Sequence, residues 1–586
     1  MIPIRSIVLA LLAALAAFSS APALGAQDTT IYAPPLIQDP RELGIQAQAA
    51  FEQMRRANLP RFDGRRPSQC QEIVGRFCYW YDEKSTDMPQ ELPKVVEARD
   101  RLIVLLDSIG RLQPGDNWIS GQRVRYLIEA GRLPAALRVA QECTSAGWWC
   151  DAVRGLTLHE ARRYAEAEAA FERVLGAMGT RERCTWRDLT PYLDDDTRRQ
   201  YNRNNCGTAE REAFEARVWW FARVRYGLAG NDSRTEHFAR LTYVELLRNA
   251  PSSHQFGFDE SERELLIRFG WPRGWSQDGF TRAGPNGERG GPNVVGHESV
   301  PAFRFIPPND VLTSPATSDS TEWAVQLPPV VARYSPKYAK RLIMLEHQQA
   351  LFRRGDTALV VLAYDVTGVS GLAGAPLEGA LVLSNGQKPE GQQTVRRGVP
   401  AKGTLTVRAP WGPLLMSAEI VSDSAATLVR ARYGIRPPYA MGTRVSLSDL
   451  LFYTPYESFP TTVEEVLPHA LATQKVRSAQ PLGVYWEAYN TNPEGERMMI
   501  TLTVVPETEQ TGLFARGARA LRLAREAQPV SVGAEDLSAR GSRTSSRALQ
   551  LDISTLKPGE YLVQLEIEVA GQYVIRADRR IVVTGP

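Results

Sequence analysis

The sequence predicts a multidomain α + β protein, with an α-helical region first, an α+β domain in the centre and antiparallel β-sandwich domains at the end. At 586 residues the chain is too long for a single hydrophobic core. Apolar residues recur at three- and four-residue steps before about residue 250, whereas apolar and polar residues alternate after about residue 325. This change of period predicts helices in the first half of the chain and strands in the second.

Residues 1–26 have the pattern of a signal peptide. A short basic start (MIPIR) precedes about a dozen apolar residues and a small-residue exit, SSAPALGA. Gln27 stands where a lipid-anchored protein would need a cysteine, and no later stretch approaches the roughly 20 apolar residues of a membrane span. We therefore expect an exported soluble protein, periplasmic or secreted, without a lipid anchor or a transmembrane segment after cleavage.

The charge balance argues against two classes of partner. A net charge of +3 is small for this length, so neither nucleic acid nor an acidic membrane surface is expected as a partner. No sequence motif calls for a cofactor. Together with export, this favours a protein partner at the cell envelope.

The cysteines predict disulfide bonds. An even number of cysteines in an exported chain is typical of disulfides, and proximity along the chain favours three short loops among the 15 pairings that six cysteines allow. A zinc site is the alternative, but no Cys-x-x-Cys pair is present. The favoured pairs are Cys70–Cys78, Cys143–Cys150 and Cys184–Cys206.

Residues 38–180 are predicted to form helices, and two of their segments resemble each other. Aligning Leu133 with Tyr164 gives an offset of 31 residues, and small residues recur in both copies. Gly155 and Phe171 occupy the small and aromatic positions of a tetratricopeptide repeat, which this region resembles. A plain bundle of helical hairpins is the alternative interpretation.

Residues 185–310 are predicted to form the α+β domain. Its last helix is expected to begin at Asn231-Asp232-Ser233, with Ser233 as the cap and Glu236 closing a capping box. The stretch GFDESERELLIRFGWPRGW (257–275) is interpreted as a charged turn followed by a strand, LLIRF. The glycine-rich stretch from 270 to 300 is interpreted as a long loop.

This central segment resembles the bacterial GWxTD domain family, whose function is uncharacterised. The family's strand ends in Ile-Arg-Tyr-Gly-x-Pro, and Ile267, Arg268, Gly270 and Pro272 match it, with Phe269 as the aromatic. The naming motif has decayed, because only its glycine is kept. The resemblance implies export and architecture, and it supplies no catalytic residue.

The remainder is predicted to be β-rich. Alternating segments separated by Gly and Pro turns predict a β-sandwich-like domain over 325–455 and a second one over 478–586. The motif LKPGEYLVQLEIEV in the second resembles the last strands of immunoglobulin or fibronectin domains. Residues 505–548 are interpreted as a helical or mobile insertion.

Two sets of side chains are candidate functional residues. His254, Asp259 and Glu260 could perform acid–base chemistry in a hydrolase, but acids at a turn are usually solvated, and no hydrolase or metal motif is present. Trp271 and Trp275 could bind a sugar or a peptide, although core packing is the more common role of such residues.

The sequence thus favours a non-enzymatic exported scaffold or binding protein that uses helical repeats and β-sandwiches for protein–protein interaction. A carbohydrate- or envelope-binding module and a hydrolase with a site around His254 and Glu260 are the alternatives. No cofactor and no metal ligand set is expected.

Overall fold

The computed structural model describes most of the chain after the signal-like segment. The predicted signal peptide, His254 and part of the predicted insertion at 505–548 lie outside the described residues. The residues that the structure describes are 39–62, 70–75, 77–80, 88–252, 258–283, 289–298, 302–323, 331–386, 394–437, 444–507 and 530–585.

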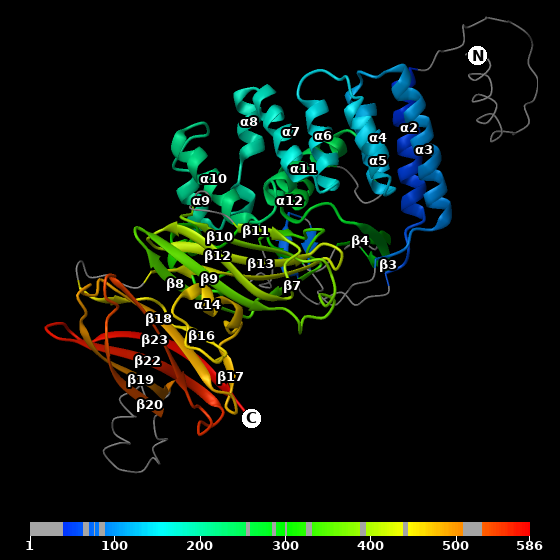
Figure 1. The fold of residues 1–586 in the computed structure, drawn as a ribbon. Coiled ribbons are helices and arrows are strands. Elements are labelled where there is room, and N and C mark those ends of the chain that lie inside the picture. Colours follow the sequence, from blue (N-terminus) through cyan, green and yellow to red (C-terminus); the bar gives the residue numbers. More distant parts are fainter. Residues whose placement is uncertain are drawn as a thin grey trace, which may run out of the picture.

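The described chain is a mixed α/β protein in which helices fill the first half. The helices before residue 270 form a row that stands on one face of a β-sheet (Figure 1). The helices are α2 (Pro40–Ala57), α3 (Pro93–Leu112), α4 (Asn117–Glu129), α5 (Leu133–Gln141), α6 (Trp149–Glu160), α7 (Tyr164–Ala177), α8 (Thr180–Arg187), α9 (Asp195–Tyr201), α10 (Ala209–Ala222), α11 (Asp232–Arg248), α12 (Glu260–Phe269) and the short α13 (Asn309–Thr313) and α14 (Val463–Val466).

Two helical hairpins, α4/α5 and α6/α7, keep the 31-residue offset expected from the sequence. Leu133 and Tyr164 open α5 and α7, and α4 and α6 end at Glu129 and Glu160. The hairpins pack closely where side chains are small. A Cβ on Gly121 would come within 2.6 Å of the Trp149 ring, so glycine sets the distance between α4 and α6.

Antiparallel sheets dominate the second half. A five-stranded sheet and a three-stranded sheet enclose one apolar core, to which both contribute buried side chains. In order, the first sheet is β11 (Thr394–Arg397), β10 (Glu378–Ser384), β13 (Leu414–Ser422), β14 (Thr427–Ile435) and β7 (Arg341–Met344), with β7 parallel to β14; the second is β12 (Lys402–Pro410), β9 (Thr357–Asp365) and β8 (His347–Arg354).

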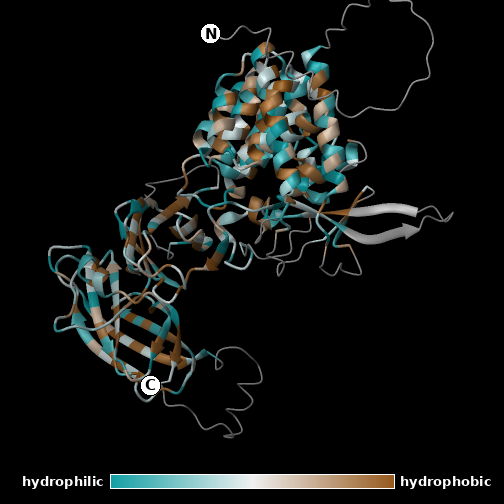
Figure 2. Cartoon of the chain, turned by 90° about the vertical axis from the view of Figure 1, so that its right-hand side faces the viewer, coloured by the Kyte–Doolittle hydropathy of each residue, from teal (hydrophilic) through white to brown (hydrophobic). Residues whose placement is uncertain are grey.

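A second pair of sheets encloses another core nearer the C-terminus. Buried residues occupy every second position along most of β22. The strands near the C-terminus in Figure 2 likewise show alternating brown and teal bands. One sheet contains β15 (Ser446–Leu447), β16 (Leu451–Tyr453), β18 (Leu482–Tyr489) and β21 (Thr544–Leu551); the other contains β17 (Lys475–Arg477), β23 (Ile575–Thr584), β22 (Gly559–Val569), β19 (Arg497–Pro506) and β20 (Val530–Leu537).

The helices and the five-stranded sheet share one hydrophobic core, which includes Val382 and Leu428 on the sheet. The loop between α10 and α11 is fastened to this sheet by a buried carboxylate. Glu419 accepts hydrogen bonds from the backbone N–H groups of Tyr226 (2.7 Å) and Gly227 (2.9 Å) and pairs with Arg432 at 3.3 Å. The helical layer is therefore joined to the sheet by both apolar and ionic contacts.

Three short strand pairs complete the described structure. They are β1 (Glu72–Val74) with β2 (Phe77–Tyr79), β3 (Gly274–Ala283) with β4 (Arg289–His297), and β5 (Phe303–Arg304) with β6 (Arg333–Tyr334). All three favoured cysteine pairs are disulfide-bonded: Cys70–Cys78, Cys143–Cys150 and Cys184–Cys206. Among the described residues, no helix has the length and apolarity to cross a membrane.

Four local predictions are wrong. The predicted helical or mobile insertion at 505–548 contains, in its described part, strand β20 and the start of β21, because both pair with neighbouring strands. LLIRF lies in helix α12, because Asp259 and Glu262 form a capping box that starts a helix there. The predicted loop at 270–300 contains the hairpin β3/β4. The α11 cap is Asn231, whose side chain accepts from the N–H of Arg234, so neither Ser233 nor Glu236 has the expected capping role.

Candidate functional site

Trp271 and Trp275 line a groove of about 400 Å³ between the helical layer and the start of β3. We call it the tryptophan groove. The two rings meet edge to face with centroids 5.3 Å apart, and Tyr243 of α11 stacks on Trp271 at 6.1 Å. Both tryptophans are half-buried, so each ring packs on one side and meets the groove on another. The remaining lining residues are Arg55, Leu59, Met88, Pro89, Gln90, Glu91, Val96, Arg99, Ile128, Glu129, Pro272, Arg273 and Gly274.

Apolar side chains also line the groove away from the two tryptophans in sequence. Met88 lies in the segment before α3, Val96 lies in the first turn of α3, and both side chains are exposed. Gly274 lies close to two of the lining residues: a Cβ on Gly274 would lie 3.3 Å from the side chains of Met88 and Pro89. The groove therefore presents apolar side chains from α3 and the segment before it as well as the two tryptophans.

Buried ion pairs hold the floor of the groove. Arg55 pairs with Glu129 at 2.7 Å and with Glu91 at 2.9 Å, and Arg99 pairs with Glu91 at 2.7 Å. Burial alone would raise the pKa of Glu129, but the guanidinium groups of Arg55 and Arg125 outweigh it and lower the pKa to about 2. The Glu129 carboxylate is thus ionised at neutral pH, and these ion pairs fix α2, α3 and α4 to one another.

A second, smaller cavity of about 60 Å³ meets the tryptophan groove at Tyr243, Trp271 and Arg273. We call it the charged pocket. Glu160, the last residue of α6, forms ion pairs with Arg273 at 3.3 Å and with Lys337. Burial would raise the pKa of Glu160, but Arg273 and Lys337 hold it at about 2. Burial lowers the pKa of Lys337, and Glu160 opposes that shift.

The imidazole of His159 is locked at the back of the charged pocket. Its Nε2 lies 2.8 Å from Glu236 and its Nδ1 lies 2.9 Å from the hydroxyl of Thr235. Glu236 also accepts from Arg240 at 2.7 Å. Because both ring nitrogens and the neighbouring carboxylate have partners, this arrangement rigidifies the junction of α6 and α11.

The two described candidates for a hydrolase, Asp259 and Glu260, each have another partner. The carboxylate of Asp259 accepts from the N–H of Glu262 at 3.1 Å and caps α12. The side chain of Glu260 is 80% exposed and pairs with Arg263 at 2.8 Å. His254 lies outside the described residues, so its distance from the two acids is not defined.

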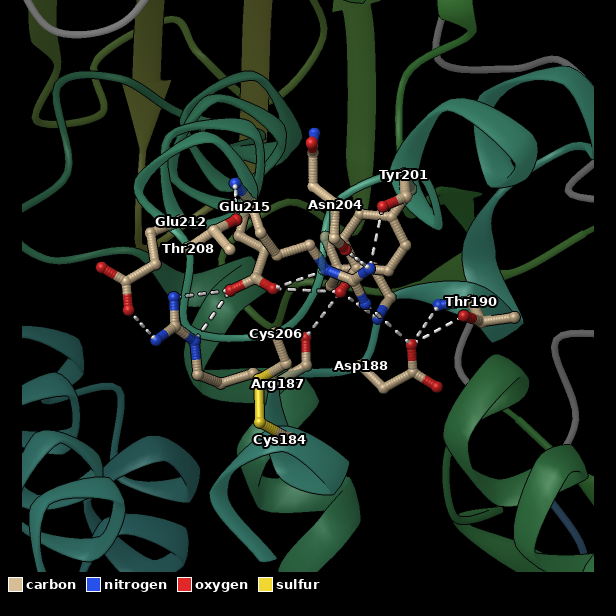
Figure 3. Close-up of polar contacts among 12 residues, drawn as sticks. Cys184, Arg187, Asp188, Thr190, Tyr201, Asn204, Cys206, Thr208, Glu212 and Glu215 are labelled. Atoms are coloured by element: carbon tan, nitrogen blue, oxygen red, sulfur yellow. Dashed lines mark hydrogen bonds and ion pairs between the residues drawn. A yellow bond between two sulfur atoms is a disulfide. The ribbon is translucent and has the colours of Figure 1, made fainter. Parts of the chain in front are cut away.

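Glu260 and Arg263 border a third groove, of about 640 Å³, whose wall includes the Cys184–Cys206 disulfide. Beside this disulfide, Arg187 pairs with Glu212 at 2.6 Å and with Glu215 at 2.7 Å (Figure 3). Tyr201 also donates to Glu215, at 3.0 Å. Within the described part of the chain, no three His, Cys, Asp or Glu side chains are grouped to hold a metal ion.

The sequence singled out Trp271 and Trp275 but missed the residues of the charged pocket. Glu160 follows His159 directly at the end of α6. Its partners Arg273 and Lys337 lie 113 and 177 residues later. Such distances leave no local pattern that sequence inspection could use.

Comparison with known proteins adds no family. No family model and no curated protein matches the sequence. Among solved structures, a red sea bream transglutaminase is 12% identical, with a TM-score of 0.14 over 42% of this chain and 32% of that one. A Bacteroides uniformis β-glucuronidase is 9% identical, with a TM-score of 0.15 over 39% of this chain and 26% of that one. The matches thus span about a third or less of these neighbours' own length.

Proposed function

We propose that this chain is an exported, non-enzymatic binding protein of the cell envelope, and that its tryptophan groove holds an extended segment of a protein partner. The observation that carries the proposal is the pair Trp271 and Trp275, half-exposed beside the exposed Met88 and Val96. Aromatic anchors in a partly desolvated groove supply most of the binding energy in many protein interfaces.

The rigid surroundings of the groove support this role. Arg55, Arg99 and their carboxylate partners are fixed by buried ion pairs, so the walls need little ordering when a ligand enters. A preorganised site binds more tightly because less conformational entropy is lost on binding.

The rest of the chain then has a supporting role. The hairpins α4/α5 and α6/α7 act as tetratricopeptide-like repeats whose stacking holds one wall, and the GWxTD-like segment supplies the tryptophans. The two β-sandwich-like units serve as spacers or docking modules.

Affinity capture with a matched variant tests the proposal. The mature chain and its Trp275→Ala variant are each immobilised and exposed to an envelope extract of the organism that encodes the protein. We expect a partner that the unaltered chain retains, that Trp275→Ala loses, and that a Trp411→Ala variant retains, since Trp411 is half-buried at a distant β-turn. A partner retained equally by all three, or no partner at all, contradicts the proposal.

A carbohydrate ligand is the second candidate, because the same two indole rings could stack on sugar faces. A glycan array distinguishes the candidates. Binding of a glycan that depends on Trp271 and Trp275, with no protein captured, would favour this second function over the first.

A further inference from the structure

The charged pocket carries more positive than negative charge where it meets the tryptophan groove. Its lining contains four cations and three carboxylates in addition to His159. The cations are Arg240, Arg273, Arg333 and Lys337, and the carboxylates are Glu160, Glu236 and Glu298. Another acid, Asp232, is fully buried behind this lining, and its carboxylate accepts from the Tyr338 hydroxyl at 2.7 Å.

The excess positive charge belongs to Arg273 and Lys337. These two cations share a single carboxylate, that of Glu160. Arg240 and Arg333, in contrast, have Glu236 and Glu298 as respective partners. One more carboxylate between Arg273 and Lys337 would therefore balance the pocket.

Both cations are accessible to a ligand. Their side chains are 41% and 35% exposed, whereas that of Glu160 is only 7% exposed. The guanidinium of Arg273 reaches Glu160 through two long hydrogen bonds, of 3.3 and 3.5 Å, and the structure gives its Nε no acceptor among the described residues. A guanidinium binds a carboxylate best through two parallel N–H groups, so Arg273 has donors to offer.

The size of the charged pocket limits what can enter. The charged pocket is the smaller of the two spaces, at about 60 Å³, so the smaller end of a ligand is the part that suits it. The adjoining tryptophan groove, at about 400 Å³, has room for several residues.

We infer that the groove recognises the C-terminus of a partner protein, with the terminal carboxylate between Arg273 and Lys337 and the preceding apolar side chains against Trp271 and Trp275. This inference rests on the proposed function, because it names the chemistry of the segment that the groove holds. Capture of a chain end by fixed cations and N–H groups is a recurrent mode of peptide recognition.

The test uses peptides that differ only at their last group. Heptapeptides selected on the mature chain from a library displayed with free C-termini are resynthesised with a fluorescent N-terminal label. Each is made as the free acid, as the carboxamide, and as a carboxamide with Asp in the last position. Dissociation constants are measured by fluorescence anisotropy for the unaltered chain and for the variants.

We expect the free acid to bind at least tenfold more tightly than either carboxamide. Arg273→Gln and Lys337→Gln should each reduce the ratio between acid and carboxamide to about twofold or less, while Trp275→Ala should weaken all three forms. Arg263→Gln, which alters the separate groove beside Cys184–Cys206, should leave every constant unchanged. Thermal unfolding of each variant shows whether a loss of binding reflects a loss of folded protein.

The possible failures are distinguishable. If acid and carboxamide bind equally and both depend on Trp275, the inference is wrong and the proposed function stands. If the Asp-carboxamide binds as tightly as the free acid, the pocket reads an acidic side chain and the C-terminal assignment is wrong. If no selected peptide depends on Trp275, the inference and the proposed function fail together.

Discussion

Gly155 of α6 lies directly against the ring of Phe171 in α7, and a Cβ on Gly155 would come within 2.7 Å of two ring carbons. Phe171 is fully buried and also packs on Phe238 of α11, with ring centroids 5.4 Å apart. The absence of a side chain at position 155 therefore determines how closely three helices approach.

Gly155→Ala should lower the free energy of unfolding by about 1–3 kcal/mol, because the added methyl group overpacks a filled core. Gly176→Ala is the matched control, since Gly176 lies in α7 and a Cβ there meets nothing within 4 Å. That control should be neutral or slightly stabilising, because alanine is the better helix former. Urea unfolding followed by circular dichroism compares the two; equal effects would show that the contact with Phe171 is unimportant.

Glu419→Ala should be strongly destabilising, by about 3–5 kcal/mol, because it leaves Arg432 as an uncompensated buried charge. Each side chain of this pair is 1% exposed, and Glu419 also accepts the two N–H groups of the 223–230 loop. Thermal unfolding is the measurement. The exposed pair Arg163–Glu166 serves as comparison, and a Glu166→Ala variant should melt close to the unaltered protein. A small effect of Glu419→Ala would contradict the fastening role assigned to this carboxylate.

Acid should weaken the charged pocket within a definite pH range. The pKa of Glu160 falls from about 4.5 to about 2 on folding, so the folded state binds this proton more weakly than the unfolded state. Its stabilisation is fully present above pH 4.5 and is lost as the pH falls towards 2. Urea unfolding at pH 5, 4 and 3 should show a shallower decline for Glu160→Gln than for the unaltered chain. Parallel declines would show that Glu160 does not titrate in this way.

His237 should produce a separate decline at higher pH. Burial lowers its pKa from 6.5 to about 3, and the neutral ring lies 2.7 Å from both the Tyr192 hydroxyl and the Trp186 carbonyl oxygen. As the pH falls, the imidazole of His237 is protonated at a higher pH in the unfolded chain than in the folded chain. Its contribution to stability is therefore fully present above pH 6.5 and decreases as the pH falls towards 3.

His237→Gln should therefore be less stable at pH 7 and should lose less further stability between pH 6.5 and 4.5. Burial also lowers the pKa of His297 and His347, so a smaller decline should remain. His469→Gln, at an exposed position, should keep the original profile. An unchanged slope in His237→Gln would contradict the assignment.

The three disulfides should differ in strength according to the loops they close. Cys184–Cys206 spans 22 residues, whereas the other two span 8 and 7. Chain entropy predicts that replacing Cys184 and Cys206 by serine costs about 1 kcal/mol more than replacing either other pair. Urea midpoints of the three double variants give the ranking, and an equal loss in all three would show that loop length does not govern it.

The sequence correctly predicted features that depend on residues close to one another in the chain. Short loops favoured the three correct cysteine pairs, and the repeat located the starts of α5 and α7 at Leu133 and Tyr164. Helix α12 was mistaken for a strand because LLIRF is a short apolar run that suits either structure. The capping pair Asp259 and Glu262 was the signal that distinguished them.

Features with distant causes were not predictable from one sequence. Glu236 has the spacing of a capping residue, yet it pairs with His159, 77 residues earlier. The tryptophans were identifiable by residue type, whereas the cations of the charged pocket come from α11, β6, the turn after β6 and the approach to β3. Their proximity depends on the packing of helices against strands, which periodicity does not encode.

The contact between the α10–α11 loop and the five-stranded sheet determines which fragments of the protein can fold when expressed alone. A fragment ending after α12 would leave Arg223, Val224 and Tyr226 without the strands that contact them, and its truncated surface would be apolar. Residues 39–437 retain both sides of that contact but would uncover Phe352 and Val361, which share a core with Leu451 and Tyr485, so we expect that piece to aggregate as well.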